Sequence, residues 1–92
     1  MLQLEPRHQK MLKEILNKYP YQFYAYGSRA KGTARKFSDL DLCYQEEIPS
    51  LIINQIGEEL EESTLPFFVE LVAWKDMSSN FRELIKPDLI TL

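Results

Sequence analysis

Two aspartates separated by one residue, Asp39 and Asp41, are the first candidates for chemistry in this chain. Residues 39–45 alternate between polar and apolar types, which predicts a strand whose aspartates share one face, roughly 6.5–7 Å apart at Cα. Two carboxylates on one face repel each other. Mg²⁺ compensates such charge well when phosphate oxygens supply its remaining ligands. A metal pair and a solvated strand edge are both compatible with the pattern.

The dipeptide Gly27-Ser28 follows an aromatic-rich segment, residues 21–26, that is typical of a strand. A strand that ends in Gly-Ser at the start of a helix offers free backbone N–H groups to an anion, and glycine allows that anion to approach closely. An ordinary turn with Ser28 as N-cap is the alternative. A Walker A loop is excluded, because Thr33 stands where that motif requires lysine.

Glu70 is the one charged residue inside the apolar segment 67–74, which predicts a third strand. An acid in such a strand is rarely buried without a partner. A metal shared with the two aspartates would explain it, and so would a salt bridge to Arg29 or Arg35.

The whole chain, residues 1–92, is expected to form a single domain. Apolar spacing, prolines and caps predict an α/β or α+β fold with a small sheet. The expected elements are a helix at 5–18, a strand at 21–26, a basic turn or helix at 28–36, a strand at 39–45, a helix from 49 or 50 with an apolar stripe at Ile52, Ile56 and Leu60, a strand at 67–74, a helix at 79–86 capped by Ser78 or Ser79, and an edge strand within 88–92. The pattern leaves strand directions open.

Composition excludes several classes of function. The net charge of −3 argues against nonspecific nucleic-acid binding. A single cysteine, Cys43, permits no internal disulfide and no cysteine-based zinc site, and a single histidine, His8, argues against a histidine-based triad. With no run of 18 apolar residues and no signal-peptide core, we expect a soluble cytoplasmic protein that does not associate with membranes.

The three features combine into a specific pattern. Residues 27–42 read Gly-Ser-Arg-Ala-Lys-Gly-Thr-Ala-Arg-Lys-Phe-Ser-Asp-Leu-Asp-Leu. This stretch resembles the signature of the nucleotidyltransferase superfamily that includes DNA polymerase β. The short chain is similar to the minimal nucleotidyltransferases, often encoded beside a small helical HEPN protein as an antitoxin–toxin pair. The resemblance implies a palm-like fold, a small mixed sheet flanked by helices.

The resemblance also implies roles for individual residues. Asp39 and Asp41 would bind two Mg²⁺ ions, and Glu70 would be the third carboxylate, which helps to bind one metal and activates the incoming hydroxyl. The family more often has aspartate at that position, so Glu70 is a departure. A displacement of about one bond length can reduce catalysis heavily.

The triphosphate would be held by Gly27 and Ser28. Arg29 and Arg35, with Lys31 and Lys36, could neutralise its charge, although a solvated loop accounts for at least two of these four basic residues.

The resemblance implies transfer of a nucleoside monophosphate, AMP from ATP, to a hydroxyl on a partner protein. The acceptor would come from a HEPN-type partner or a second subunit, in a homo- or hetero-oligomer. A catalytically silent antitoxin that binds nucleotide and contacts its toxin directly is the alternative. An aminoglycoside-type transferase is a third reading, disfavoured because no second domain is present.

Other residues are interpreted as structural. Cys43 is expected in or near the core, and His8 on the surface of the first helix. Trp74, Phe67 and Phe68 are expected in the core or at a partner interface.

Overall fold

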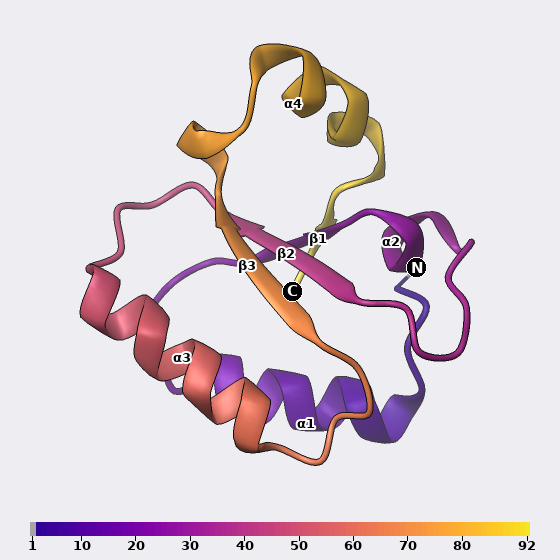
Figure 1. Ribbon diagram of the computed structural model, residues 1–92, viewed down its shortest axis with the longest axis vertical. Helices are drawn as coiled ribbons and strands as arrows, with labels where there is room; N and C mark the ends of the chain where they lie inside the picture. The colour runs from indigo at the N-terminus through magenta and orange to yellow at the C-terminus, as the bar shows by residue number, and fades with distance from the viewer. Residues whose placement is uncertain (1) are drawn as a thin grey trace.

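A computed structural model describes residues 2–92 as a four-stranded sheet with helices packed around it (Figure 1). Short 3-10 turns follow β3 and α4. In chain order the main elements are α1 Pro6–Leu16, β1 Tyr24–Tyr26, α2 Ser28–Lys31, β2 Leu40–Tyr44, α3 Ser50–Glu62, β3 Val69–Ala73, α4 Ser79–Ile85 and β4 Ile90–Thr91.

The sheet is mixed, with strand order β3-β2-β1-β4. β1 pairs antiparallel with both β2 and β4, whereas β2 and β3 run parallel. Parallel neighbours need a crossover connection, and α3 supplies it. The expectation of a small mixed sheet flanked by helices is confirmed, and the pairing settles the strand directions that the sequence pattern left open.

The main core lies between one face of the sheet and the helices α1 and α3, which run side by side below the sheet in Figure 1. Leu12 and Ile56 of these helices meet Leu40 and Leu42 of β2, and all four side chains are fully buried. Burial of each such side chain is worth about 1.5–3 kcal/mol. Truncation of Leu42 to alanine would therefore loosen the helices from the sheet, at about 2–5 kcal/mol.

A smaller cluster lies on the opposite face, below α4. It contains Tyr26, Cys43, Met77 and Ile85. In Figure 1, α4 lies on the far side of the sheet from α1 and α3, and its residue Ile85 belongs to this cluster. The candidate carboxylates emerge from this same face.

Helix ends follow the sequence signals. Ser78 caps α4 by accepting a hydrogen bond from the N–H of Phe81 at 3.2 Å, as expected. The stripe of α3 is confirmed, since Ile56 and Leu60 are buried and Ile52 packs against them. Gly32, in the left-handed region at φ 80°, ends α2 after Lys31, so the basic segment 28–36 is only partly helical.

Strand bounds are shorter than expected. The segment 21–26 contributes only Tyr24–Tyr26, because β2 and β4 pair only with this part of it. The edge strand expected within 88–92 is β4. Among residues 2–92, no helix combines the length and the apolar character that crossing a membrane would require.

Candidate active site

Three carboxylates emerge from one face of the sheet, near the start of β2 and β3. Asp41 and Glu70 are direct partners in the parallel β2–β3 register, and residues paired across neighbouring strands point to the same face. Asp39 lies two residues before Asp41, at the entrance to β2, so alternation places its side chain on this face as well. The structure therefore brings together the three acidic residues that the sequence singled out.

Electrostatic repulsion is concentrated on Asp41. Burial raises the pKa of its carboxyl, and the negative charges of Glu70 and then Asp39 raise that pKa further. Within the described residues none of the three acids forms an ion pair, so the salt bridge considered for Glu70 is not formed. A bound cation would relieve this repulsion.

The donor set fits Mg²⁺ that binds together with phosphate. Residues 2–92 hold no preformed cage of three or more His, Cys, Asp or Glu side chains. Mg²⁺ does not require one, because it is usually held by one or two carboxylates and by oxygens of substrate phosphates and water. Asp39 and Glu70 are exposed and Asp41 is half-buried, which leaves hard oxygen ligands open to a metal–nucleotide complex.

Gly27 lies directly beside Asp41, because Tyr26 of β1 is the register partner of that aspartate. A Cβ built on Gly27 would lie 2.5 Å from Oδ2 of Asp41. Gly27 also has φ 79° and ψ −157°, a region that glycine alone adopts readily. Close approach and backbone conformation both require glycine where β1 turns into α2.

Ser28 begins α2 immediately after this turn. The carbonyl of Gly27 accepts hydrogen bonds from the N–H groups of Ala30 and Lys31, at 3.1 and 3.0 Å. The N–H groups of the first helical residues have no intrahelical partner. The turn expected to hold the triphosphate thus lies next to the carboxylates, with N–H donors at its tip.

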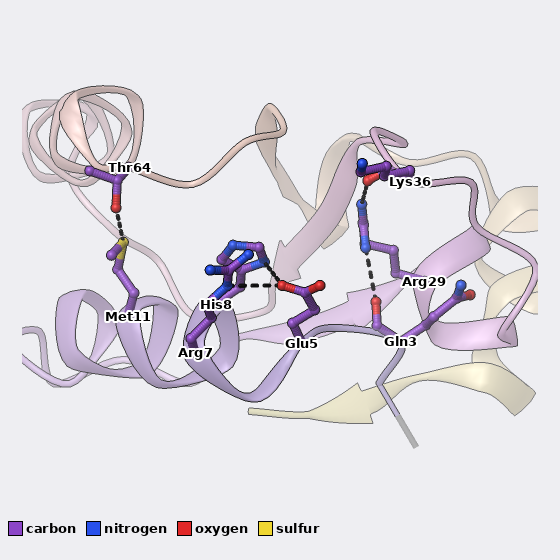
Figure 2. A network of polar contacts seen from close by, with 8 residues as sticks. All are labelled: Gln3, Glu5, Arg7, His8, Met11, Arg29, Lys36 and Thr64. Atoms are coloured by element: carbon purple, nitrogen blue, oxygen red, sulfur yellow. Dashed lines mark hydrogen bonds and ion pairs between the residues drawn. The ribbon is translucent and has the colours of Figure 1, made fainter.

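The structure places Arg29 differently from the expectation that it contacts phosphate. Its side chain is buried, and its guanidinium donates to three backbone carbonyls. Figure 2 shows the guanidinium reaching toward Gln3 on one side and Lys36 on the other. Burial lowers the pKa of Arg29, while the charge of Asp39 opposes that shift. These contacts remove Arg29 from the set of candidate nucleotide ligands.

Arg35 is exposed, and its contact with a nucleotide stays a prediction. It lines a groove of about 940 Å³ on the α1 side of the molecule, together with Lys36 and Phe37. Neither the three carboxylates nor the Gly27-Ser28 turn lines this groove. Among the described residues, the exposed basic side chains of the loop therefore face the groove or solvent, as a solvated loop would.

Tyr26 lies beside the candidate site, as the register partner of Asp41, and was missed by the sequence reasoning. Burial raises the pKa of its phenol to about 12, with further contributions from Asp41 and Glu70. Its ring meets Phe81 of α4 edge-on, with ring centroids 5.9 Å apart. Its position directly before Gly27 could have identified it. The strand pattern alone could not, because it did not assign Tyr26 to a face of the sheet.

The structure also tests the expected burial of Cys43 and His8. Cys43 is fully buried, as expected, and burial raises the pKa of its thiol to about 11. His8 is half-buried, with 14% of its side chain exposed where it lines the groove beside α1, so it is less exposed than expected. Its ring packs edge-on against Phe67 with centroids 5.8 Å apart.

Comparison with known proteins finds one relative by sequence and two solved structures with a similar fold. The chain is 37% identical over 95 residues to "Probable protein adenylyltransferase MntA" of Haemophilus influenzae, covering 99% of this chain and 83% of that relative. A solved structure described as "Crystal structure of the toxin-antitoxin with AMP-PNP" matches with a TM-score of 0.65 and 20% identity, covering 96% of this chain and 72% of that one. A putative nucleotidyltransferase from Sulfolobus solfataricus matches with a TM-score of 0.49 and 16% identity, covering 90% of this chain and 73% of that one.

The family itself follows from the extent of the sequence match. A family model described as "Polymerase beta, Nucleotidyltransferase" matches residues 10–90. This range includes the Gly27-Ser28 turn, both aspartates and Glu70. The resemblance read from residues 27–42 is confirmed, and the fold agrees with it. The chain belongs to the polymerase beta nucleotidyltransferase family.

Proposed function

We propose that this chain binds Mg²⁺ and ATP at the Gly27-Ser28 turn and transfers AMP to a hydroxyl group of a partner protein. The convergence of Asp39, Asp41 and Glu70 on one face, beside a turn that must be glycine, is the observation that carries the proposal. The repulsion among these carboxylates gives a divalent cation a reason to bind there. The similarity to a protein named as a probable protein adenylyltransferase supports AMP as the transferred group.

The proposed reaction is an in-line displacement at the α-phosphate. The acceptor oxygen forms a bond to the α-phosphorus, the bond from that phosphorus to the bridging oxygen breaks, and pyrophosphate leaves. When bound, two Mg²⁺ ions supply charge stabilisation for the attacking and leaving oxygens. Asp39 and Asp41 hold the metal–nucleotide complex. Glu70, paired in register with Asp41, takes the proton of the acceptor hydroxyl.

The proposed partner is a HEPN-type toxin, with this chain as its antitoxin. One observation supports a toxin partner. The neighbour with a TM-score of 0.65 is described as a toxin–antitoxin with AMP-PNP. Because that neighbour is only 20% identical, its likeness is one of fold, and the partner has to be tested directly.

The test is a measurement of covalent modification. The chain is incubated with Mg-ATP and a purified HEPN protein encoded beside it, and both proteins are weighed by intact-mass spectrometry. We expect the partner to gain the mass of one or more AMP groups. The gain should disappear with EDTA and with the Asp39→Asn/Asp41→Asn variant. An unmodified partner under all conditions would exclude protein adenylylation of this toxin.

Glu70 favours one alternative function. Because glutamate stands where aspartate is expected, and is exposed at that position, the chain could bind nucleotide without transferring it. It would then neutralise its toxin by contact alone. In that case the partner stays unmodified, the complex still forms, and toxin activity is suppressed equally by the wild type and the double asparagine variant.

A further inference from the structure

Arg29 is the buried charged side chain of the described residues, only 5% exposed. Its Nε donates to the carbonyl of Ser38 at 2.9 Å, one terminal nitrogen to that of Gln3 at 2.9 Å, and the other to that of Lys36 at 3.2 Å. The guanidinium carbon lies 4.2 Å from the centre of the Phe67 ring. Bonds from a charged donor and stacking on an aromatic ring together offset the cost of burying this cation.

Two of the three carbonyls belong to the loop that leads directly into Asp39. Ser38 is the residue immediately before this aspartate, and Lys36 lies two residues earlier. The loop is otherwise open to solvent, since Phe37 between them is 64% exposed. Arg29 is anchored in α2 at the Gly27-Ser28 turn. One side chain therefore ties the phosphate-side turn to the backbone on which Asp39 stands.

A second set of hydrogen bonds, separate from those of Arg29, holds the other end of the same loop. The side-chain amide of Gln3 donates to the carbonyl of Ala34 and accepts from its N–H, both at 2.9 Å. Figure 2 shows Gln3 beside Arg29, with the Arg29 bonds directed to Gln3 and Lys36. The hydrogen bonds of Arg29 and those between Gln3 and Ala34 can be removed separately. Gln3→Ala frees the loop at Ala34 and leaves the carbonyl that Arg29 uses.

We propose that Arg29 is a positioning residue that presents the Asp39 carboxylate to the metal on the face occupied by Asp41, and that it makes no contact with phosphate. The three carbonyls are reached by three separate nitrogens of the planar guanidinium, whereas the three N–H donors of a lysine ammonium share one nitrogen and span a shorter distance. Outer residues that orient a metal ligand typically change metal affinity by about 10–100-fold when they are replaced. This inference rests on the proposed metal–nucleotide site.

The test compares metal-dependent nucleotide binding in matched variants. The probe is α,β-methylene ATP, in which the bond that breaks during transfer is replaced by a stable bridge. Its affinity is measured by calorimetry with and without Mg²⁺ for the wild type, Arg29→Lys, Asp39→Asn and the Arg29→Lys/Asp39→Asn double variant. We expect Arg29→Lys to lower the Mg²⁺-dependent gain in affinity by about 10–100-fold and to leave binding without Mg²⁺ nearly unchanged.

The double variant separates positioning from general loosening. If Arg29 acts through Asp39, its replacement should change binding by less than about twofold once Asp39 is already asparagine, because the two effects are not independent. Gln3→Ala serves as the control. It removes the side-chain bonds to Ala34 but leaves the backbone carbonyl groups that Arg29 uses, so it should retain the Mg²⁺-dependent gain in affinity.

Each result decides between defined alternatives. If Arg29→Lys lost the same nucleotide affinity with and without Mg²⁺, Arg29 would contact phosphate, and the inference would be overturned. So would additive losses in the double variant, or an Arg29→Lys protein that is unfolded by circular dichroism, since its role would then be structural alone. Failure of the proposed function has a separate signature, because the wild type and Asp39→Asn would then show the same response to Mg²⁺.

Discussion

Asp41 on β2 and Glu70 on β3 occupy the same level of two parallel strands, and their carboxylates rise from the same face of the sheet. This register partnership connects residues that lie far apart in the chain. It makes Glu70 available as the third acid of the proposed metal-dependent transfer site. It also explains part of the raised pKa of Asp41, to which the charge of Glu70 contributes.

The first prediction concerns the role of Glu70 in transfer. Replacement of a group that accepts a proton typically costs about 10²–10⁴-fold in rate, so Glu70→Gln should lose transfer by that order. It should keep nucleotide binding, because Asp39 and Asp41 remain. Glu70→Asp should retain or raise transfer, since it restores the usual family residue. Rates are measured from α-labelled ATP onto the partner, and transfer by Glu70→Gln at the wild-type rate would exclude Glu70 as the third catalytic carboxylate.

The second prediction concerns nucleotide binding by the aspartate pair. Isothermal titration with Mg-ATP should show binding by the wild type and none by Asp39→Asn/Asp41→Asn, because neutral amides do not replace carboxylates as Mg²⁺ ligands. Lys10→Gln, on the exposed surface of α1, is a control with one positive charge removed away from the site. Unchanged affinity in the double variant would refute the assignment of the metal site.

The third prediction concerns stability and pH. Because the pKa of Asp41 is raised in the folded state above its ordinary value of 3.8, folding is penalised once this carboxyl ionises, and the penalty is absent below that value. In metal-free buffer at pH 7, Asp41→Asn should therefore melt at or above the wild-type temperature. The difference should fade as the pH falls toward 3.8.

Addition of Mg-ATP should reverse this order, because a ligand that binds only the folded wild type stabilises it selectively. Thermal melts followed by circular dichroism give both comparisons. A melting temperature several degrees lower for Asp41→Asn in metal-free buffer would mean that the carboxylate holds structure instead.

The fourth prediction uses two glycines as a matched pair. Gly27 and Gly32 both have positive φ, 79° and 80°, but only a Cβ on Gly27 would meet another group, the Asp41 carboxylate. Gly32→Ala should cost about 1–2 kcal/mol of stability from backbone strain and should leave Mg-ATP binding intact. Gly27→Ala should displace Asp41 and abolish binding. Urea unfolding and calorimetry measure the two effects, and equal binding by both variants would contradict the close-approach argument.

Local patterns in the sequence determined the elements and the identities of the candidate acids. Helix α3 follows from the spacing of Ile52, Ile56 and Leu60, and the start of α4 from Ser78, because caps and apolar periodicity act between near neighbours in the chain. The alternation through Asp39, Asp41 and Cys43 likewise assigned these side chains to one face. The stretch 27–42 was enough to indicate the family.

Only the tertiary structure decided which neighbours these residues meet. Strand parity could place Glu70 on one of two faces, but the parallel pairing that joins it to Asp41 depends on how α3 crosses over. The sequence favoured a phosphate-binding role for Arg29, because it shows the charge of this residue and its place directly after Gly27-Ser28. Its burial and its bonds to carbonyls depend on backbone brought together by folding. Residue type fixes what chemistry a side chain can do, whereas contacts between distant segments fix which of those chemistries is available.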